Sequence, residues 1–170
     1  LGLSKARAIV SGAAPLQESL RAWYRKIGIL ITNGYGMTEN CAITTHLEPY
    51  MMGKAGSVGI AQPEVELKID SETSEILMRG PFVMKEYYKQ PELTAEVIKD
   101  GWLHTGDQGH LDEEGFLFIT GRVKDIFKTS KGKYIEPLVL ESYFADIIDF
   151  EQICVAGLGL PQPILLAVLS

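Results

Sequence analysis

Few residues in this sequence belong to the types that crosslink a chain or bind transition metals. Its 170 residues include two cysteines, Cys41 and Cys154, and three histidines. Two distant cysteines make no disulfide framework, which favours a reducing compartment, and we expect a cytoplasmic location. The histidines have no metal-ligand spacing, and neither cysteine has the partners of a nucleophile. The composition therefore indicates neither a zinc site nor a cysteine nucleophile.

Long apolar runs and an excess of positive charge are also missing. No run is long enough to cross a bilayer, although peripheral contact of a longer protein with a membrane stays open. The net charge of −6 argues against general binding of nucleic acid. The hydrophobic content of 46% is enough to bury a core. These features predict a globular protein that is not a general binder of nucleic acid.

Both ends of the chain favour a piece of a longer protein. The sequence begins at Leu1 rather than at methionine, and it closes in the strand-like apolar run 164–169. An unpaired apolar strand exposes an edge that promotes aggregation, so natural termini seldom look like this. We therefore expect further chain on both sides.

The first quarter of the sequence predicts a strand–helix–strand unit. A short buried strand is expected at 7–11 and a second at 29–32. Between them, a helix is expected at about 15–27, with Pro15 in its first turn and Gly28 at its C-terminal cap. Strand, helix and strand at this spacing indicate two parallel neighbours.

The remainder alternates between strand and turn patterns. Period-two alternation and turn residues predict two hairpins, and proline-initiated stretches predict two helices. A polar, glycine-punctuated segment at 121–133 is typical of a linker or hinge. The expected elements are hairpins 65–69/75–79 and 108–111/116–120, helices 91–99 and 137–145, and strands 153–156 and 164–169.

The predicted fold class is α/β, in four parts. The chain should begin with the end of a parallel α/β sheet layer and continue as an antiparallel, β-barrel-like subdomain. A hinge should then lead into a small α/β domain that is only partly present. The expected boundaries are 1–54, 55–120, 121–125 and 126–170.

Two polar, glycine-bearing loops follow the two strands of the first unit. Ligands bind beyond the carboxyl ends of strands in open parallel sheets, so both loops should line one crevice. In the first loop, Gly12, Ala13 and Ala14 would let a flat ligand approach the backbone closely. An ordinary strand-to-helix connection is an equal alternative for this loop taken alone.

The second loop, Asn33 to Glu39, is more specific. Tyr35 offers a ring for stacking on a base, and Gly34 and Gly36 allow a tight backbone around it. Thr38 offers a hydroxyl to a phosphate, and Glu39 offers a hard oxygen ligand suited to Mg²⁺. The alternative is a glycine turn beside a buried core tyrosine.

At this point the sequence resembles the adenylate-forming (AMP-binding) superfamily. The segment Gly34–Glu39 resembles the family's signature, and three further motifs follow the family's order over about residues 7–145. Gly101–Asp107 resembles its aspartate motif, Gly121–Asp125 its hinge motif, and Ser11–Pro15 its adenine-side loop. One such motif is weak evidence, and four in order are strong.

The resemblance implies roles for particular residues. Asp107 would accept both ribose hydroxyls, Arg122 would contact ribose and phosphate oxygens, and Lys124 would mark the pivot of the C-terminal domain. The alternatives are an aspartate capping a turn, a surface arginine and a solvated linker lysine. Thr38, Glu39 and Lys124 are the expected catalytic residues, with Glu39 as metal ligand. The expected nucleotide-binding residues are Gly12, Ala13, Ala14, Asn33, Gly34, Tyr35, Gly36, Met37, Thr38, Asp107 and Arg122.

The implied activity is that of an ATP-dependent acyl-CoA synthetase, which uses ATP, Mg²⁺ and coenzyme A and forms AMP. Residues 129–137 look most like the long-chain fatty acyl-CoA branch, which predicts fatty-acid metabolism. Lys131 stands where many members have glycine, so a coenzyme A contact at that loop is in doubt. We expect this chain alone to be inactive. An adenylation domain, a luciferase-like relative and a non-catalytic AMP-binding module are the alternatives.

Overall fold

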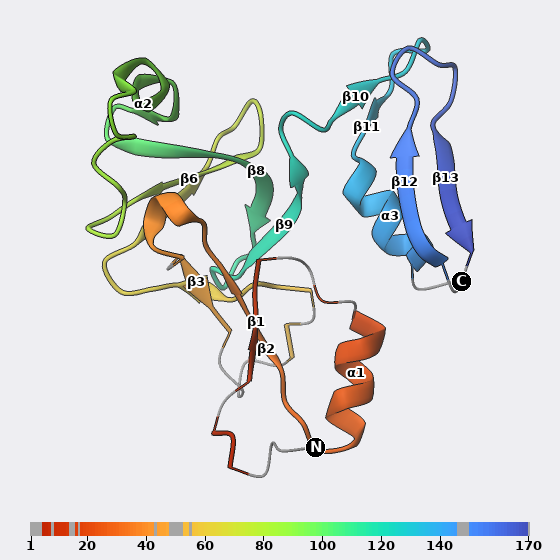
Figure 1. The fold of residues 1–170 in the computed structure, drawn as a ribbon, viewed down its shortest axis with the longest axis horizontal. Coiled ribbons are helices and arrows are strands. Elements are labelled where there is room, and N and C mark those ends of the chain that lie inside the picture. Colours follow the sequence, from red (N-terminus) through yellow and green to blue (C-terminus); the bar gives the residue numbers. More distant parts are fainter. Residues whose placement is uncertain are drawn as a thin grey trace.

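The computed structural model describes residues 5–7, 9–13, 16, 18–42, 44–47, 53–54, 56–145 and 150–169 (Figure 1). Its strands are short, apart from β8, and its helices have at most nine residues. In chain order the elements are β1 Val10–Ser11, α1 Glu18–Lys26, β2 Thr32–Tyr35, the 3₁₀ helix η1 Thr38–Asn40, β3 Thr45–His46, β4 Ile60–Ala61, β5 Glu66–Ile69, β6 Glu75–Arg79, α2 Pro91–Val97, β7 Ile98–Lys99, β8 Trp102–Leu111, β9 Leu117–Arg122, β10 Phe127–Lys128, β11 Tyr134–Ile135, α3 Pro137–Ala145, β12 Phe150–Ala156 and β13 Ile164–Leu169.

The predicted order of strand, helix and strand is confirmed, but the first strand, expected to be buried at 7–11, is β1 at Val10–Ser11, and Val10 is 67% exposed. β1 and β2 pair in parallel, with Ser11 opposite Asn33, and α1 connects them. Gly28 takes a φ of +81° just after α1, as a helix-ending glycine does. Pro15, expected in the first turn, lies outside the described residues. β3 and β4 then extend the sheet antiparallel, in the order β1-β2-β3-β4.

β2 begins later than predicted and continues into the motif. The expected strand 29–32 overlaps the observed one only at Thr32, and Asn33, Gly34 and Tyr35, expected in a loop, are strand residues. Tertiary pairing explains the shift, because Gly34 and Tyr35 pair with His46 and Thr45 of β3. The neighbouring strand thus overrides the weak strand propensity of Asn-Gly.

An antiparallel sheet of five strands follows, and two of its strands, β6 and β8, lie at the upper left of Figure 1. The order is β5-β6-β8-β7, and β9 also pairs with β8. Both predicted hairpins are confirmed, by β5 with β6 and by β8 with β9. The barrel-like closure is a correction: no pairing among the described strands closes the sheet, since β5, β7 and β9 each pair with one strand of it. The predicted helix 91–99 ends at Val97, because Ile98 and Lys99 pair with β8.

One hydrophobic cluster lies between the first unit and this sheet. Tyr35 of β2 is buried with Ile76, Met78, Leu103 and Leu117 of β6, β8 and β9. Backbone hydrogen bonds join the same regions, from Val58 N to the Leu117 carbonyl and from Leu117 N to the Gly59 carbonyl. The core therefore crosses the expected boundary between residues 54 and 55, and the division into domains stays a prediction.

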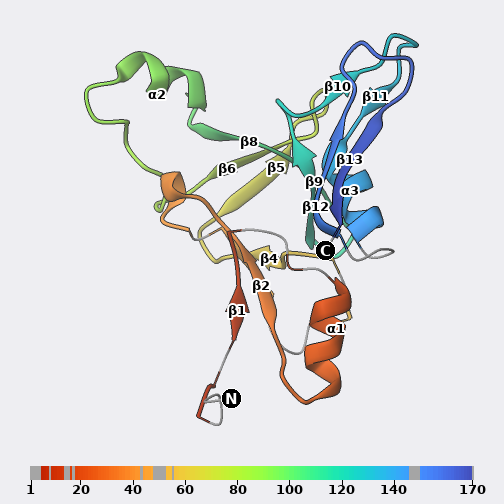
Figure 2. The same ribbon diagram turned by 45° about the vertical axis from the view of Figure 1, so that its right-hand side comes forward.

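The predicted linker 121–133 contains more structure than expected. Gly121 and Arg122 are the last residues of β9, and β10 and β11 form a small hairpin within and just beyond the segment. The helix at 137–145 is confirmed as α3, and β12 and β13 pair antiparallel. Figure 2 shows these elements gathered at one end of the molecule, with α3 beside β12. Among the helices described, none has the length and apolarity needed to span a membrane.

Candidate nucleotide site

The two glycine-bearing loops lie side by side, as predicted. Ser11 and Asn33 are partners across the β1–β2 pair, and a Cβ added to Gly12 would lie 3.7 Å from the carbonyl oxygen of Gly34. Ala13 has a φ of +66°, an uncommon left-handed conformation for alanine. Ala14 lies outside the described residues. The described part of the first loop thus runs along the second, at the carboxyl ends of β1 and β2.

Tyr35 is the central side chain of the candidate site. It is 9% exposed, and its hydroxyl donates a hydrogen bond to Asp107 Oδ2 at 2.7 Å. Burial, reinforced by the Asp107 carboxylate, raises the pKa of Tyr35, so the phenol stays a donor. The interpretation as a buried core tyrosine is confirmed. The predicted stacking on a base stays a prediction.

Asp107 lies within strand β8, so it does not cap a turn. Around it, Ile76 of β6 faces three β8 residues, because Glu75 pairs with Gln108 and Leu77 with His104. This β-bulge changes the direction of the strand locally. Asp107 Oδ1 lies 3.2 Å from Arg122 Nε, and Oδ2 accepts from Tyr35. A carboxylate has about four acceptor positions, so it can still accept two hydroxyl groups.

Arg122 and Lys124 follow Asp107 in space. Arg122 is the cross-strand partner of Asp107, and its side chain is 71% exposed. Lys124 is exposed in the turn that follows β9, where Val123 N donates to the Gly106 carbonyl at 2.8 Å. Both cations thus lie at the Asp107 end of the candidate site. The pivot role of Lys124 stays a prediction.

Thr38 and Glu39 lie in η1, which directly follows Gly36 and Met37. Asn40 Oδ1 accepts a hydrogen bond from Met37 N at 2.9 Å and so fixes the entry to this turn. Thr38 is exposed, as a phosphate ligand would have to be. Glu39 Oε1 accepts a hydrogen bond from the Tyr87 hydroxyl at 2.6 Å, and this bond is the main cause that raises the pKa of Tyr87 to about 12.

A magnesium ion at Glu39 would need ligands from the nucleotide. No group of three or more His, Cys, Asp or Glu residues that could hold a metal occurs in the described part of the chain. Mg²⁺ in nucleotide sites is commonly held by one or two carboxylates together with substrate phosphates and water. The single carboxylate of Glu39 fits a cation held mainly by nucleotide phosphates and water. It would not form a cation site on its own.

Several residues that shape the site are not predicted from the sequence. Both carboxylate oxygens of Glu75 have a partner. Oε1 accepts a hydrogen bond from Gly106 N at 2.8 Å, and Oε2 lies 2.9 Å from His104 Nδ1. Thr105 Oγ1 donates to the Ile76 carbonyl at 2.8 Å. Together these contacts hold the bulge that precedes Asp107. The alternating pattern of the hairpin gave no signal for them, because it predicts a strand and not the partners of its side chains.

Asn33 presents a buried acceptor. Its side-chain Oδ1 is inaccessible to water and has no hydrogen-bond partner among the described residues. Buried polar atoms nearly always have a hydrogen-bond partner, so we expect the donor to this oxygen to lie outside the described residues. The nucleotide-binding role of Asn33 stays a prediction.

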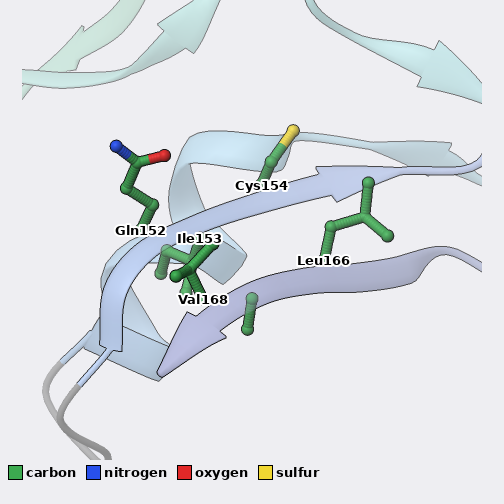
Figure 3. A pocket seen from close by; sticks show the side chains of 6 residues that line it. Gln152, Ile153, Cys154, Leu166 and Val168 are labelled. Atoms are coloured by element: carbon green, nitrogen blue, oxygen red, sulfur yellow. The ribbon is translucent and has the colours of Figure 1, made fainter. Parts of the chain in front are cut away.

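A pocket elsewhere contains none of the predicted site residues. It lies on the hairpin of β12 and β13 (Figure 3). Its lining is formed by Gln152, Ile153, Cys154, Leu166, Ala167 and Val168. The candidate nucleotide site therefore depends on the Tyr35–Asp107–Arg122 cluster and the neighbouring loops.

Known proteins resemble this chain in sequence over most of its length. Residues 2–88 match the family described as AMP-binding enzyme. The chain is 35% identical over 164 residues to long chain acyl-CoA synthetase 4 of Arabidopsis thaliana, covering 89% of this chain and 25% of the relative. It is 36% identical over 165 residues to indoleacetate–CoA ligase of Aromatoleum aromaticum, covering 91% and 32%. The chain thus spans about a quarter to a third of the length of these relatives.

Solved structures with this fold include ligand complexes. O-succinylbenzoate coenzyme A synthetase from Bacillus subtilis in complex with AMP has a TM-score of 0.85 at 31% identity, over 96% of this chain and 36% of that chain. The same enzyme in complex with ATP and magnesium ion has a TM-score of 0.82 at 32% identity, over 94% and 35%. The mixed α/β architecture is therefore shared with these enzymes.

Proposed function

The chain belongs to the AMP-binding enzyme family, and on this premise we propose that it is part of an AMP-forming ligase that joins a carboxylic acid to coenzyme A. In the proposed reaction the acid attacks the α-phosphate of ATP, pyrophosphate leaves, and the coenzyme A thiol then displaces AMP from the acyl adenylate. The residues of this chain would bind and orient the nucleotide, which is how enzymes of phosphoryl and adenylyl chemistry mainly act.

The observation that carries the proposal is the contact of Asp107 with both Tyr35 and Arg122. These residues come from three motifs that are far apart in the sequence, and the fold brings them to one place. With its two remaining acceptor positions, the Asp107 carboxylate suits the paired hydroxyls of a ribose. Glu39 and Thr38 would face the phosphates, where a bound Mg²⁺ would offset their negative charge.

For the acid, we propose a long-chain fatty acid. The resemblance of residues 129–137 supports it, as does the likeness to the Arabidopsis long chain acyl-CoA synthetase. An aryl acid is the second candidate, because the likeness to indoleacetate–CoA ligase is equally strong.

The test is ATP–pyrophosphate exchange by the full-length protein, with fatty acids of graded chain length and with aryl acids. We expect the highest kcat/KM with a long-chain acid, and an aryl preference would reject the fatty-acid part alone. Nucleotide binding without exchange on any acid would reject the ligase and support a non-catalytic module. We also expect the 170-residue chain alone to form no acyl adenylate.

Asp107→Asn supplies a check on the site within the same assay. Loss of charge-assisted hydrogen bonds, which contribute about 1.5–3 kcal/mol each, should lower kcat/KM for ATP roughly 10- to 100-fold. Asp100→Asn is the matched control, because Asp100 is exposed in the turn between β7 and β8 and belongs to none of the motifs. Equal kinetics for the two variants would count against the proposed site.

A further inference from the structure

A tyrosine from outside the predicted motifs contacts the predicted metal ligand. Tyr87 lies between β6 and α2, and its hydroxyl donates to Glu39 Oε1 at 2.6 Å. The same stretch of chain also holds the Glu39 backbone, because Met84 N donates to the Glu39 carbonyl at 2.7 Å. Glu39 is therefore fixed by this segment at its main chain and at its side chain.

The other end of Tyr87 is anchored to α2. Thr94 Oγ1 accepts a hydrogen bond from Tyr87 N at 2.9 Å and donates to the Gln90 carbonyl at 2.9 Å. The backbone of Tyr87 is thus held in place by its hydrogen bond to Thr94 of α2. The phenol is half-buried, and its hydroxyl is the donor in the bond to Glu39.

Tyr88, the next residue, provides a natural contrast. Its side chain is 80% exposed, and its ring lies near Lys89, with Lys89 Nζ 5.2 Å from the ring centroid. The two adjacent tyrosines therefore differ in their contact with Glu39. The hydroxyl of Tyr87 donates to Glu39, whereas Tyr88 is exposed to solvent.

We propose that Tyr87 is a positioning residue that occupies Oε1 of Glu39 and leaves Oε2 for the divalent cation of bound MgATP. The inference rests on the proposed function, since it requires Glu39 to bind that cation. A hydrogen bond to a metal-binding carboxylate fixes its rotamer and restricts which oxygen can coordinate, and loss of such a partner typically lowers metal affinity about 10- to 100-fold.

The test measures how strongly Mg²⁺ increases the affinity of the full-length protein for ATP. Calorimetry without an acid substrate gives the dissociation constant of ATP with Mg²⁺ and with chelator, and their ratio is the contribution of the cation. We expect Tyr87→Phe to reduce this ratio about tenfold and Tyr88→Phe to leave it unchanged. AMP affinity in chelator should be the same for both variants, because the ribose side of the site is intact.

Glu39→Gln separates the two levels of the inference. It should reduce the ratio at least as much as Tyr87→Phe, and the double variant should show little further loss. A normal ratio for Tyr87→Phe beside a reduced one for Glu39→Gln overturns the positioning role and leaves the proposed function intact. A normal ratio for Glu39→Gln overturns the metal role of Glu39 and this inference with it. If Tyr87→Phe lowers ATP affinity by the same factor with and without Mg²⁺, the contact with Glu39 is merely structural. That result also overturns the positioning role of Tyr87.

Discussion

Gly36 is the residue whose size is most tightly limited in the predicted nucleotide loop. A Cβ at this position would lie 2.3 Å from the carbonyl carbon of Ala42, which is backbone and cannot rotate away. That backbone is itself held, because Ala42 N donates to the Met37 carbonyl at 2.8 Å. The glycine is therefore required by the return of the chain after η1, independently of any ligand.

Gly36→Ala should lower the free energy of unfolding of the full-length protein by about 1–3 kcal/mol or more, as overpacking does. It should also weaken AMP binding, because Tyr35 and η1 flank the residue. Gly53→Ala is the control, since nothing lies within 4 Å of a Cβ built there. Thermal unfolding and AMP titration of both variants test this. Equal melting temperatures would show that the Ala42 backbone yields easily.

At this scale the sequence predicted residue types better than their contacts. The ring of Tyr35 and the carboxylates of Glu39 and Asp107 are candidate contacts to nucleotide or metal from the sequence alone. Their bonds to one another and to Tyr87 join residues 48 and 72 positions apart. Such contacts depend on the tertiary fold, and no local pattern encodes them.

Among the elements, β8 matters most for the site because of its bulge. Glu75 of β6 holds the bulge through Gly106 N and His104 Nδ1, and Gly106 takes a φ of +73° there. The side chain of Glu75 is 14% exposed, so an unpaired group left by its removal would be poorly hydrated. The bulge in turn determines where Asp107 meets Tyr35 and Arg122.

Glu75→Ala should therefore act on both stability and binding. Leaving the Gly106 N–H without its acceptor should lower the free energy of unfolding by about 1–3 kcal/mol. AMP affinity should fall as well, although Glu75 is not a predicted ligand. Glu72→Ala, at an exposed position in the preceding turn, should change neither. Chemical denaturation with AMP titration checks both effects, and an AMP affinity that is unchanged would show that the bulge persists without Glu75.

Elements with a strong local signal were predicted well. α3 begins at its proline and ends at Ala145 as expected, and both hairpins form where they are predicted. Predictions failed where pairing with a distant strand overrode a local pattern. β2 extends through Asn-Gly, β9 through Gly121, and β7 replaces the last turn of the expected helix.

For the whole molecule, the shared core has a consequence for cooperativity. Tyr35 and Leu103 lie in one cluster although the sequence predicts a boundary between their segments. Val155 is also buried, but it lies in β12, where its N–H donates to Glu141 Oε1 of α3 at 2.7 Å. The sheet of β1 to β4 and the sheet of β5 to β9 should thus unfold together. α3, β12 and β13 pack against one another and should be able to unfold separately.

Leu103→Ala and Val155→Ala test this in the full-length protein by native-state hydrogen exchange. Leu103 is 0% exposed, so Leu103→Ala should cost about 2–5 kcal/mol and lower the protection of β2 and β8 by equal amounts. Val155→Ala should lower the protection of β12 and β13 and leave β2 unchanged. Loss of protection in β8 alone after Leu103→Ala would mean that the parallel unit folds independently and that residue 54 is a true domain boundary. Equal losses in both sheets would mean that the candidate nucleotide site is formed by a single cooperative unit, in which Tyr35 and Asp107 cannot be separated without unfolding it.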